Sequence, residues 1–160
     1  MHKISTLFIG LVLSGFACTN NTYIYEVNEV PVEPNNAGKD KEKRPEQYLN
    51  ILYANLYQEP LSPNELVRLN DVITSIGDKQ VAYETVVAKM MADPKVKIPS
   101  REDMLQDIEQ FIRDTYKRFY VREPSQSEIA WFKNYIESRP NVTPELIYYS
   151  FATSDEYNFY

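Results

Sequence analysis

Apolar residues recur at steps of three and four positions over most of the chain after about residue 46. In the first such segment, Leu49, Leu52 and Leu56 fall on one helix face, with Tyr53 and Tyr57 beside them. Steps of three and four return to the same side of an α-helix, whereas a half-buried strand alternates at every second residue. The pattern therefore predicts an all-α fold built from amphipathic helices.

Short polar motifs predict where these helices begin. Ser62-Pro63-Asn64-Glu65 and Ser125-Gln126-Ser127-Glu128 are capping boxes, in which a serine and a glutamate satisfy free backbone N–H groups at a helix start. We expect the first helix to end at Pro60, the second to lie between Ser62 and Gly77, and the third to run from about Lys79 to Ala92. One long helix should then fill the chain from Ser100 to just before Pro124, with Met104 and Leu105 on its apolar side. The last two helices should open at Ser125 and Thr143, and Ser154 should cap a final turn.

The two halves of this pattern are related by a shift of 63 residues. The shift superposes Tyr53 on Tyr116, Tyr57 on Tyr120, Ser62 on Ser125, Glu65 on Glu128, Leu69 on Phe132 and Ile73 on Ile136. Such self-similarity indicates an internal duplication, and one unit of this size buries little apolar surface alone. We therefore expect two tandem three-helix units, residues 46–98 and 99–160, packed as one helical body through their aromatic faces.

The first 17 residues have the composition of an export signal peptide. Lys3 precedes a short apolar run and small residues that lead to Cys18, and the run is too short to span a bilayer. The segment Ser14-Gly15-Phe16-Ala17-Cys18 resembles the lipobox of bacterial lipoproteins, although it has Gly15 where that family more often has leucine. The resemblance implies cleavage before Cys18 and acylation of its thiol with fatty acids such as palmitate. The lipid would then hold the protein on a membrane.

Residues 18–45 have the composition of a flexible, lipid-anchored tether. They contain three prolines, one glycine and the charged run 39–44, a mixture that is typical of linkers. As a flexible coil, this segment would hold the helical body roughly 25 to 30 Å from the anchor on average. Residues 23–32 are β-prone, and they would either add as a strand to a partner's sheet or remain extended or disordered.

The mature chain would contain no histidine and no free thiol, because His2 lies in the signal peptide and Cys18 is its only cysteine. This excludes cysteine nucleophiles, Ser-His arrangements and the usual zinc sites. Two of the three acids Asp103, Asp107 and Glu109 could supply the carboxyl groups of a glycosidase, but acids at a helix start more often serve the helix dipole. A net charge of −6 disfavours nucleic acid. We expect no catalytic residues, cofactor or metal.

The candidate binding residues are cations and aromatics in the second half. Arg113, Lys117 and Arg122 form a basic stripe near the end of the fourth helix, where they serve either the helix dipole or an anionic ligand. Trp131 and Tyr135 are expected either to pack in the core or to present a ring pair to a sugar or a protein. The closing residues Tyr157, Phe159 and Tyr160 either complete the core or dock a partner.

The second half also resembles a known module. The motif consists of Tyr116, Tyr120, Arg122, Pro124, Glu128, Trp131 and the closing Ser154-Asp155-Glu156-Tyr157. It resembles an uncharacterised helical module of secreted bacterial proteins and, more distantly, the phycobilisome linker domain, over residues 48–96 and 111–157. The first copy departs from it, with Gln58 or Glu59 in place of the arginine and Arg68 in place of the tryptophan. The resemblance implies an attachment domain that binds and does not catalyse.

Together these features predict a non-catalytic outer-membrane lipoprotein, an accessory or scaffold subunit of a cell-envelope complex. Its partners would be proteins of an assembly, secretion or uptake machinery, with peptidoglycan or another envelope glycan as the alternative ligand. The residues after Cys18 lack the aspartate that resembles an inner-membrane retention signal and the acidic run that resembles a surface-export signal. The expected location is therefore the periplasmic face of the outer membrane, with the cell surface as the alternative.

Overall fold

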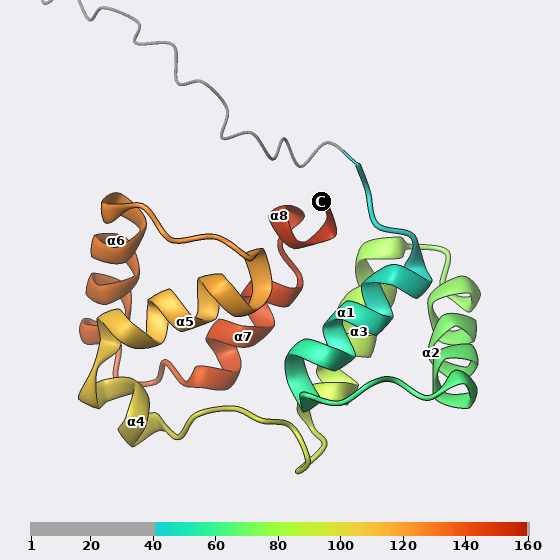
Figure 1. Cartoon of the computed structure of the whole chain (residues 1–160), viewed down its shortest axis with the longest axis horizontal. Coiled ribbons are helices and arrows are strands. Elements are labelled where there is room, and N and C mark those ends of the chain that lie inside the picture. The colour runs from blue at the N-terminus through green and yellow to red at the C-terminus, as the bar shows by residue number, and fades with distance from the viewer. Residues whose placement is uncertain (1–40, 160) are drawn as a thin grey trace, which may run out of the picture. The chain divides into compact units, whose positions relative to one another are not determined.

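The computed structural model describes residues 41–159, which belong to the part of the chain that begins at Pro34. These residues form eight helices and no strand, so the predicted all-α class is confirmed (Figure 1). The helices are α1 (Pro45–Tyr57), α2 (Pro63–Ser75), α3 (Lys79–Met91), α4 (Arg101–Gln106), α5 (Ile108–Tyr120), α6 (Gln126–Glu137), α7 (Pro144–Ala152) and α8 (Asp155–Asn158). The signal peptide 1–17, Cys18, the tether up to residue 40 and Tyr160 lie outside the described residues.

Capping side chains begin the helices from α2 onward, largely as the sequence predicts. The predicted caps Ser62, Ser100, Ser125, Thr143 and Ser154 each accept a hydrogen bond from the backbone N–H three residues on. At Ser100 and Ser125 the carboxylate three residues later accepts a hydrogen bond from the serine backbone N–H, which completes a capping box. At Ser62 only the first bond forms, and the Glu65 carboxylate pairs with Arg68 instead. These bonds satisfy backbone donors that have no partner within the helix.

The prediction of one long helix from Ser100 to Pro124 is wrong, because the chain breaks at Asp107. This residue has φ −145° and ψ 84°, and its carboxylate accepts a hydrogen bond from the backbone N–H of Gln110 at 2.9 Å. Asp107 therefore caps α5 and leaves α4 as a separate short helix. Leu105, which was expected inside, is 41% exposed, whereas Met104 is fully buried. The apolar spacing continues across the break and so gives no sign of it.

The helix bounds follow the same 63-residue offset as the sequence. α1 and α5 occupy corresponding positions from end to end, and α2 and α6 begin at corresponding residues. Both α1 and α5 stop at a left-handed residue that is not glycine, Gln58 with φ 59° and Val121 with φ 56°. The start of α7 lies 65 residues beyond that of α3, two more than the offset. The division into two three-helix units stays a prediction.

One hydrophobic core runs through both halves of the described chain. α3 packs against α7, and buried residues of α1, α5 and α8 belong to the same cluster. The Tyr48 hydroxyl on α1 donates to the carbonyl of Ala152 on α7 at 3.0 Å, and Asn55 Nδ2 donates to the Tyr157 hydroxyl at 3.0 Å. The rings of Tyr48 and Tyr157 meet edge to face with centroids 5.5 Å apart. The halves therefore meet through aromatic side chains, as the sequence predicts.

The residues just ahead of α1 are fastened to the C-terminal end of the chain. The Lys43 backbone N–H donates to the carbonyl of Asn158 at 2.8 Å, and Glu42 and Phe159 form an isolated β-bridge. The Lys43 ammonium donates to the carbonyls of Tyr157 and Phe159, the latter at 3.0 Å, and lies 4.7 Å from the centre of the Tyr157 ring. The predicted tether therefore ends sooner than Pro45, because its last residues belong to the helical body.

Replacing Lys43 with alanine is expected to lower the free energy of unfolding by about 1–3 kcal/mol, because two carbonyls lose a charged hydrogen-bond donor. Chemical denaturation of the full chain, followed by far-UV circular dichroism, measures the change. Lys89→Ala, an exposed lysine on α3, is the control and should stay within about 0.5 kcal/mol of the parent. Equal stability of the two variants would contradict this role for Lys43.

Candidate interaction surface

The predicted basic stripe on α5 is neutralised by acidic neighbours. Arg113 pairs with Glu109 at 2.8 Å and with Glu123 at 3.6 Å, and Lys117 pairs with Glu123 at 2.8 Å. The hydrogen bond from Lys117, aided by the charge of Arg113, holds the pKa of Glu123 below its usual value. The half-buried Arg113 and the exposed Lys117 therefore lie on a face of mixed charge. Their role in binding an anionic ligand stays a prediction.

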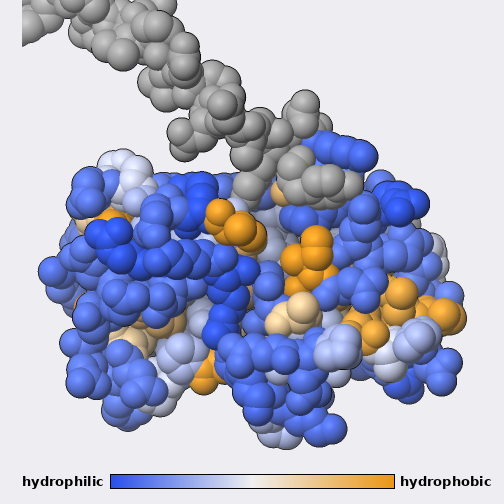
Figure 2. Space-filling model, viewed as in Figure 1, coloured by the Kyte–Doolittle hydropathy of each residue, from blue (hydrophilic) through white to orange (hydrophobic). Residues whose placement is uncertain are grey.

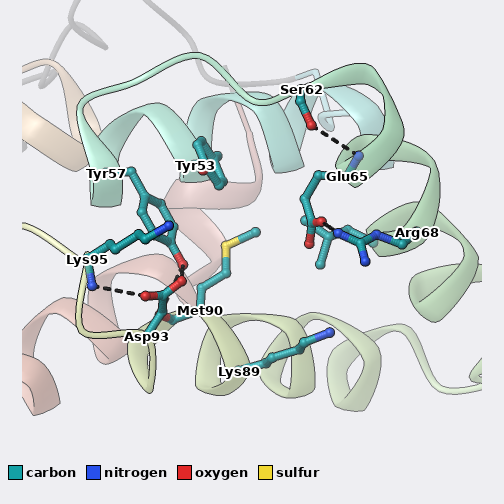
Figure 3. Close-up of a pocket in the computed structure, with 10 residues that line it drawn as sticks. Tyr53, Tyr57, Ser62, Glu65, Arg68, Lys89, Met90, Asp93 and Lys95 are labelled. Carbon is teal, nitrogen blue, oxygen red and sulfur yellow. Dashed lines mark hydrogen bonds and ion pairs between the residues drawn. The ribbon is translucent and has the colours of Figure 1, made fainter.

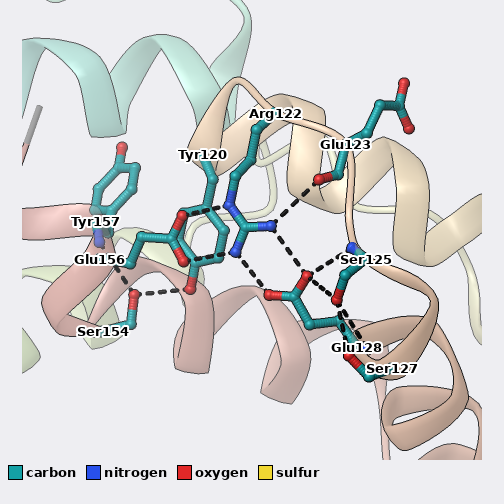
Figure 4. Close-up of polar contacts among 9 residues, drawn as sticks. All are labelled: Tyr120, Arg122, Glu123, Ser125, Ser127, Glu128, Ser154, Glu156 and Tyr157. Carbon is teal, nitrogen blue, oxygen red and sulfur yellow. Dashed lines mark hydrogen bonds and ion pairs between the residues drawn. The ribbon is translucent and has the colours of Figure 1, made fainter. Parts of the chain in front are cut away.

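Arg122 is half-buried and is held by two carboxylates (Figure 4). Its Nε and Nη2 atoms donate to the two oxygens of Glu156 at 2.6 and 2.9 Å. Its Nη2 and Nη1 atoms donate to the two oxygens of Glu128 at 2.7 and 3.0 Å, and Nη1 also donates to the carbonyl of Glu123 at 3.2 Å. A guanidinium group has five N–H donors, and all five are used in this way. These contacts hold Arg122 to its own protein, and its role in ligand binding stays a prediction.

The guanidinium of Arg122 also lies against two aromatic rings. Its central carbon is 4.8 Å from the ring centre of Tyr116 and 5.6 Å from that of Tyr120. We call Arg122 with these two tyrosines, Glu128 and Glu156 the arginine clamp. The hydrogen bonds from Arg122 lower the pKa of Glu128 to about 2, and burial raises the pKa of Tyr120 to about 12. The clamp joins the end of α5 to the first turn of α6 and to α8.

The closing aromatic residues belong mainly to the core. Tyr157 is completely buried, and burial raises the pKa of its hydroxyl. Phe159 is half-buried and forms the bridge with Glu42, while Tyr160 lies outside the described residues. The sequence left open whether Tyr157 completes the core or docks a partner, and the structure places it in the core.

Of the two rings predicted as a pair on α6, Trp131 is exposed and Tyr135 is half-buried. Trp131 is 59% exposed, and its indole stacks on the ring of Tyr135 with centroids 5.2 Å apart and planes 11° from parallel. It also meets Phe132 edge to face at 4.8 Å, and the guanidinium of Arg139 covers the Tyr135 ring at 4.4 Å. These contacts hold the indole in one orientation while leaving much of it in water.

A groove of about 320 Å³ lies between this ring pair and α7. Its walls are formed by Tyr120, Trp131, Phe132, Tyr135, Leu146, Ile147, Ser150 and Phe151. Leu146, in the first turn of α7, is 45% exposed and extends the apolar edge of the groove. We call Trp131, Tyr135 and Leu146 the α6–α7 groove rim. The face of the protein drawn in Figure 2 is mostly hydrophilic with separate apolar patches, which is ordinary for a folded surface.

The acidic residues weighed as a hydrolytic pair have local structural partners. Asp103 completes the capping box at Ser100, Asp107 caps α5, and Glu109 pairs with Arg113. Within residues 41–159, no group of three or more histidine, cysteine, aspartate or glutamate side chains is placed to hold a metal ion. In the same range, no helix is both long and apolar enough to cross a membrane.

Replacing Arg122 with alanine is expected to lower the free energy of unfolding by about 2 kcal/mol at pH 7, because two carboxylates lose their charged donor. Glu128 has a folded pKa near 2, below its usual 4.5, so its contribution is present above about pH 4.5 and is lost as the pH falls toward 2. The difference in the free energy of unfolding between the wild type and Arg122→Ala should therefore become smaller as the pH falls from 4.5 toward 2. Urea denaturation at several pH values measures it.

The matched control is Arg68→Ala, which removes an exposed arginine that pairs with Glu65, the residue equivalent to Glu128. Its effect on stability should be much smaller, because an exposed ion pair contributes little. A gap for Arg122→Ala that stays constant from pH 7 to pH 2 would contradict the assigned pairing.

Comparison with known proteins gives this arrangement no family. No protein-family model matches the chain, and no curated protein or solved structure matches it. The resemblance of the second half to the helical module of secreted proteins therefore stays a prediction. The candidate site residues are therefore chosen from the geometry of the structure alone, and the α6–α7 groove rim is the strongest candidate surface among them.

Proposed function

We propose that this protein is a non-catalytic accessory or scaffold subunit of a cell-envelope complex and binds a protein partner through the α6–α7 groove rim. The observation that carries the proposal is the exposed Trp131, stacked on the half-buried Tyr135 and lying beside the exposed Leu146. The lipid predicted on Cys18 would keep this surface at the outer membrane, facing the periplasm.

The groove rim has the chemistry of a protein-docking surface. Tryptophan and tyrosine dominate the binding energy of many protein interfaces, because each buries a large apolar area and loses little conformational freedom. Here the stacking contact already orders the indole of Trp131 before a partner arrives. An apolar side chain of the partner would enter the groove between α6 and α7 and cover Leu146. Peptidoglycan or another envelope glycan is the alternative ligand, since an exposed indole can also stack on a sugar ring.

The double variant Trp131→Ala with Leu146→Ala tests the groove. It is expected to weaken partner binding about 30-fold or more, because a central interface tryptophan typically contributes 2 kcal/mol or more. Wild type and variant, purified from native membranes in mild detergent, are compared for membrane proteins present in stoichiometric amount. Val67→Ala on α2 is the control, because Val67 is as exposed as Trp131, at 60%, and lies outside the groove.

Three outcomes of this experiment are decisive. Loss of the same stoichiometric protein from the groove variant, with retention by the Val67 variant, supports the proposal. Retention by both variants contradicts it. Binding to isolated sacculi that disappears with Trp131→Ala would instead favour the glycan alternative.

Replacing Cys18 with serine tests the predicted anchor. The oxygen side chain removes the thiol to which the acyl chains would attach, so the mature protein should move from the detergent phase to the aqueous phase. Mass spectrometry of the wild-type N-terminus should show the added fatty acids on Cys18. A mature N-terminus without fatty acid would contradict the anchor and leave the docking proposal standing.

A further inference from the structure

A pocket of about 450 Å³ lies in the first half of the described chain, between α1, α2 and the end of α3 (Figure 3). Tyr57, Leu69 and Met90 are buried at its floor, and Tyr53, Glu65 and Asp93 are half-buried in its wall. Arg68, Lys89 and Lys95 are exposed at its rim. The interior therefore presents two carboxylates and a tyrosine pair, and the cations stand around the opening.

This pocket corresponds to the arginine clamp of the second half. At the 63-residue offset, the pocket residues Tyr53, Tyr57, Ser62, Glu65 and Asp93 correspond to Tyr116, Tyr120, Ser125, Glu128 and Glu156. In the second half, the Arg122 guanidinium is surrounded by four of these counterparts, Tyr116, Tyr120, Glu128 and Glu156. The tyrosine hydroxyls differ in their partners, because Tyr57 donates to Asp93 at 3.4 Å, whereas its counterpart Tyr120 bonds with Ser154 Oγ at 2.8 Å.

The arginine itself is what the first half lacks. The position equivalent to Arg122 is Glu59, which is exposed and does not line the pocket. Without a guanidinium beside them, the rings of Tyr53 and Tyr57 stack on each other at 4.1 Å and 16°, whereas Tyr116 and Tyr120 meet edge to face at 5.4 Å and 83°. The first half thus keeps the frame of the clamp around an open space.

We propose that this pocket binds the guanidinium group of an arginine side chain from a partner protein. Glu65 and Asp93 would accept its N–H donors, and the face of a tyrosine ring would lie against its plane, as in the second half. A planar fork of donors suits two carboxylates and an aromatic face better than a compact ammonium does. The proposal is independent of the α6–α7 groove, because no residue is shared between the two surfaces.

The rim cations compete with this occupant only weakly. Arg68 reaches Glu65 from the same helix, but its side chain is 75% exposed, and an exposed pair of this kind is worth about 0–1 kcal/mol. Lys89 and Lys95 are exposed and can move toward water. An incoming arginine can therefore displace Arg68 from Glu65 at little cost. A lone side chain binds with a dissociation constant on the order of 1–10 mM, so useful affinity requires the rest of the partner.

The four methionines allow a direct test in the full chain. Met90 lines the pocket, whereas Met104 is buried on α4 away from it. With ¹³C-methyl methionine, N-acetyl-arginine amide should shift the Met90 signal in a saturable way and leave Met104 unchanged. N-acetyl-citrulline amide, which has the same shape without the charge, should shift Met90 at least tenfold less at equal concentration.

Two variants tie this signal to the proposed contacts. Glu65→Gln with Asp93→Asn should weaken binding at least tenfold, and the exposed Glu137→Gln on α6 is the matched control. Glu59→Arg should place a guanidinium in the pocket from within the chain, which abolishes the response to the probe and raises Tm. Glu59→Gln should do neither.

Several results would overturn the proposal. These are a Met90 signal that does not respond to the arginine probe, an equal response to citrulline, or unchanged binding in the Glu65 and Asp93 variant. A response to inorganic phosphate in place of the arginine probe would identify an anion site and contradict it. Tighter binding of free L-arginine than of the capped amide would assign the pocket to the free amino acid and contradict a partner side chain.

Discussion

Tyrosine burial is the constraint around which the described part of the chain is arranged. A tyrosine ring contributes a large apolar area, but its hydroxyl needs a hydrogen-bond partner once it leaves water. Tyr48 meets this need on the carbonyl of Ala152, and Tyr120 meets it on Ser154. Burial raises the pKa of Tyr48, so its hydroxyl remains a donor at any ordinary pH. Because Tyr48 and Ala152 lie on helices from different halves, the bond that satisfies one residue also joins the two halves.

Local signals predict most of this fold, and contacts between distant residues explain where prediction fails. Caps such as Ser125 act within one helical turn, so sequence spacing alone identifies them. The helix break at Asp107 was not predicted, because an acidic residue can either lie in the first turn of a helix or cap the start of a new one. The neighbouring apolar spacing is the same in both cases. The partners of Arg122 could not be predicted, because Glu156, one of its two carboxylate partners, lies 34 residues further along the chain. Trp131 was left between core and surface, since its place one position off the apolar face fits either.

The two halves differ at one position that decides whether an arginine fills the space between the carboxylates, Arg122 in the second half and Glu59 in the first. Val121 turns the chain through the left-handed region, a conformation that costs a β-branched residue roughly 1–2 kcal/mol. The clamp at the next residue, Arg122, offsets this cost by engaging two carboxylates. Gln58 makes the same turn in the first half, but Glu59 follows it and leaves the corresponding carboxylates on an open pocket. The same backbone thus supports an internal tie in one half and a free surface in the other.

The fastening of Lys43 to the C-terminal carbonyls has a mechanical consequence. Any tension that arrives along the chain from the N-terminal side meets Lys43 before it meets α1, and from there it passes to the backbone of Tyr157 and Phe159. The force is therefore shared between the two ends of the described chain, and the first helix is shielded from being peeled away turn by turn. A body that is pulled by an anchor gains resistance to unravelling from this arrangement, without any covalent link between its ends.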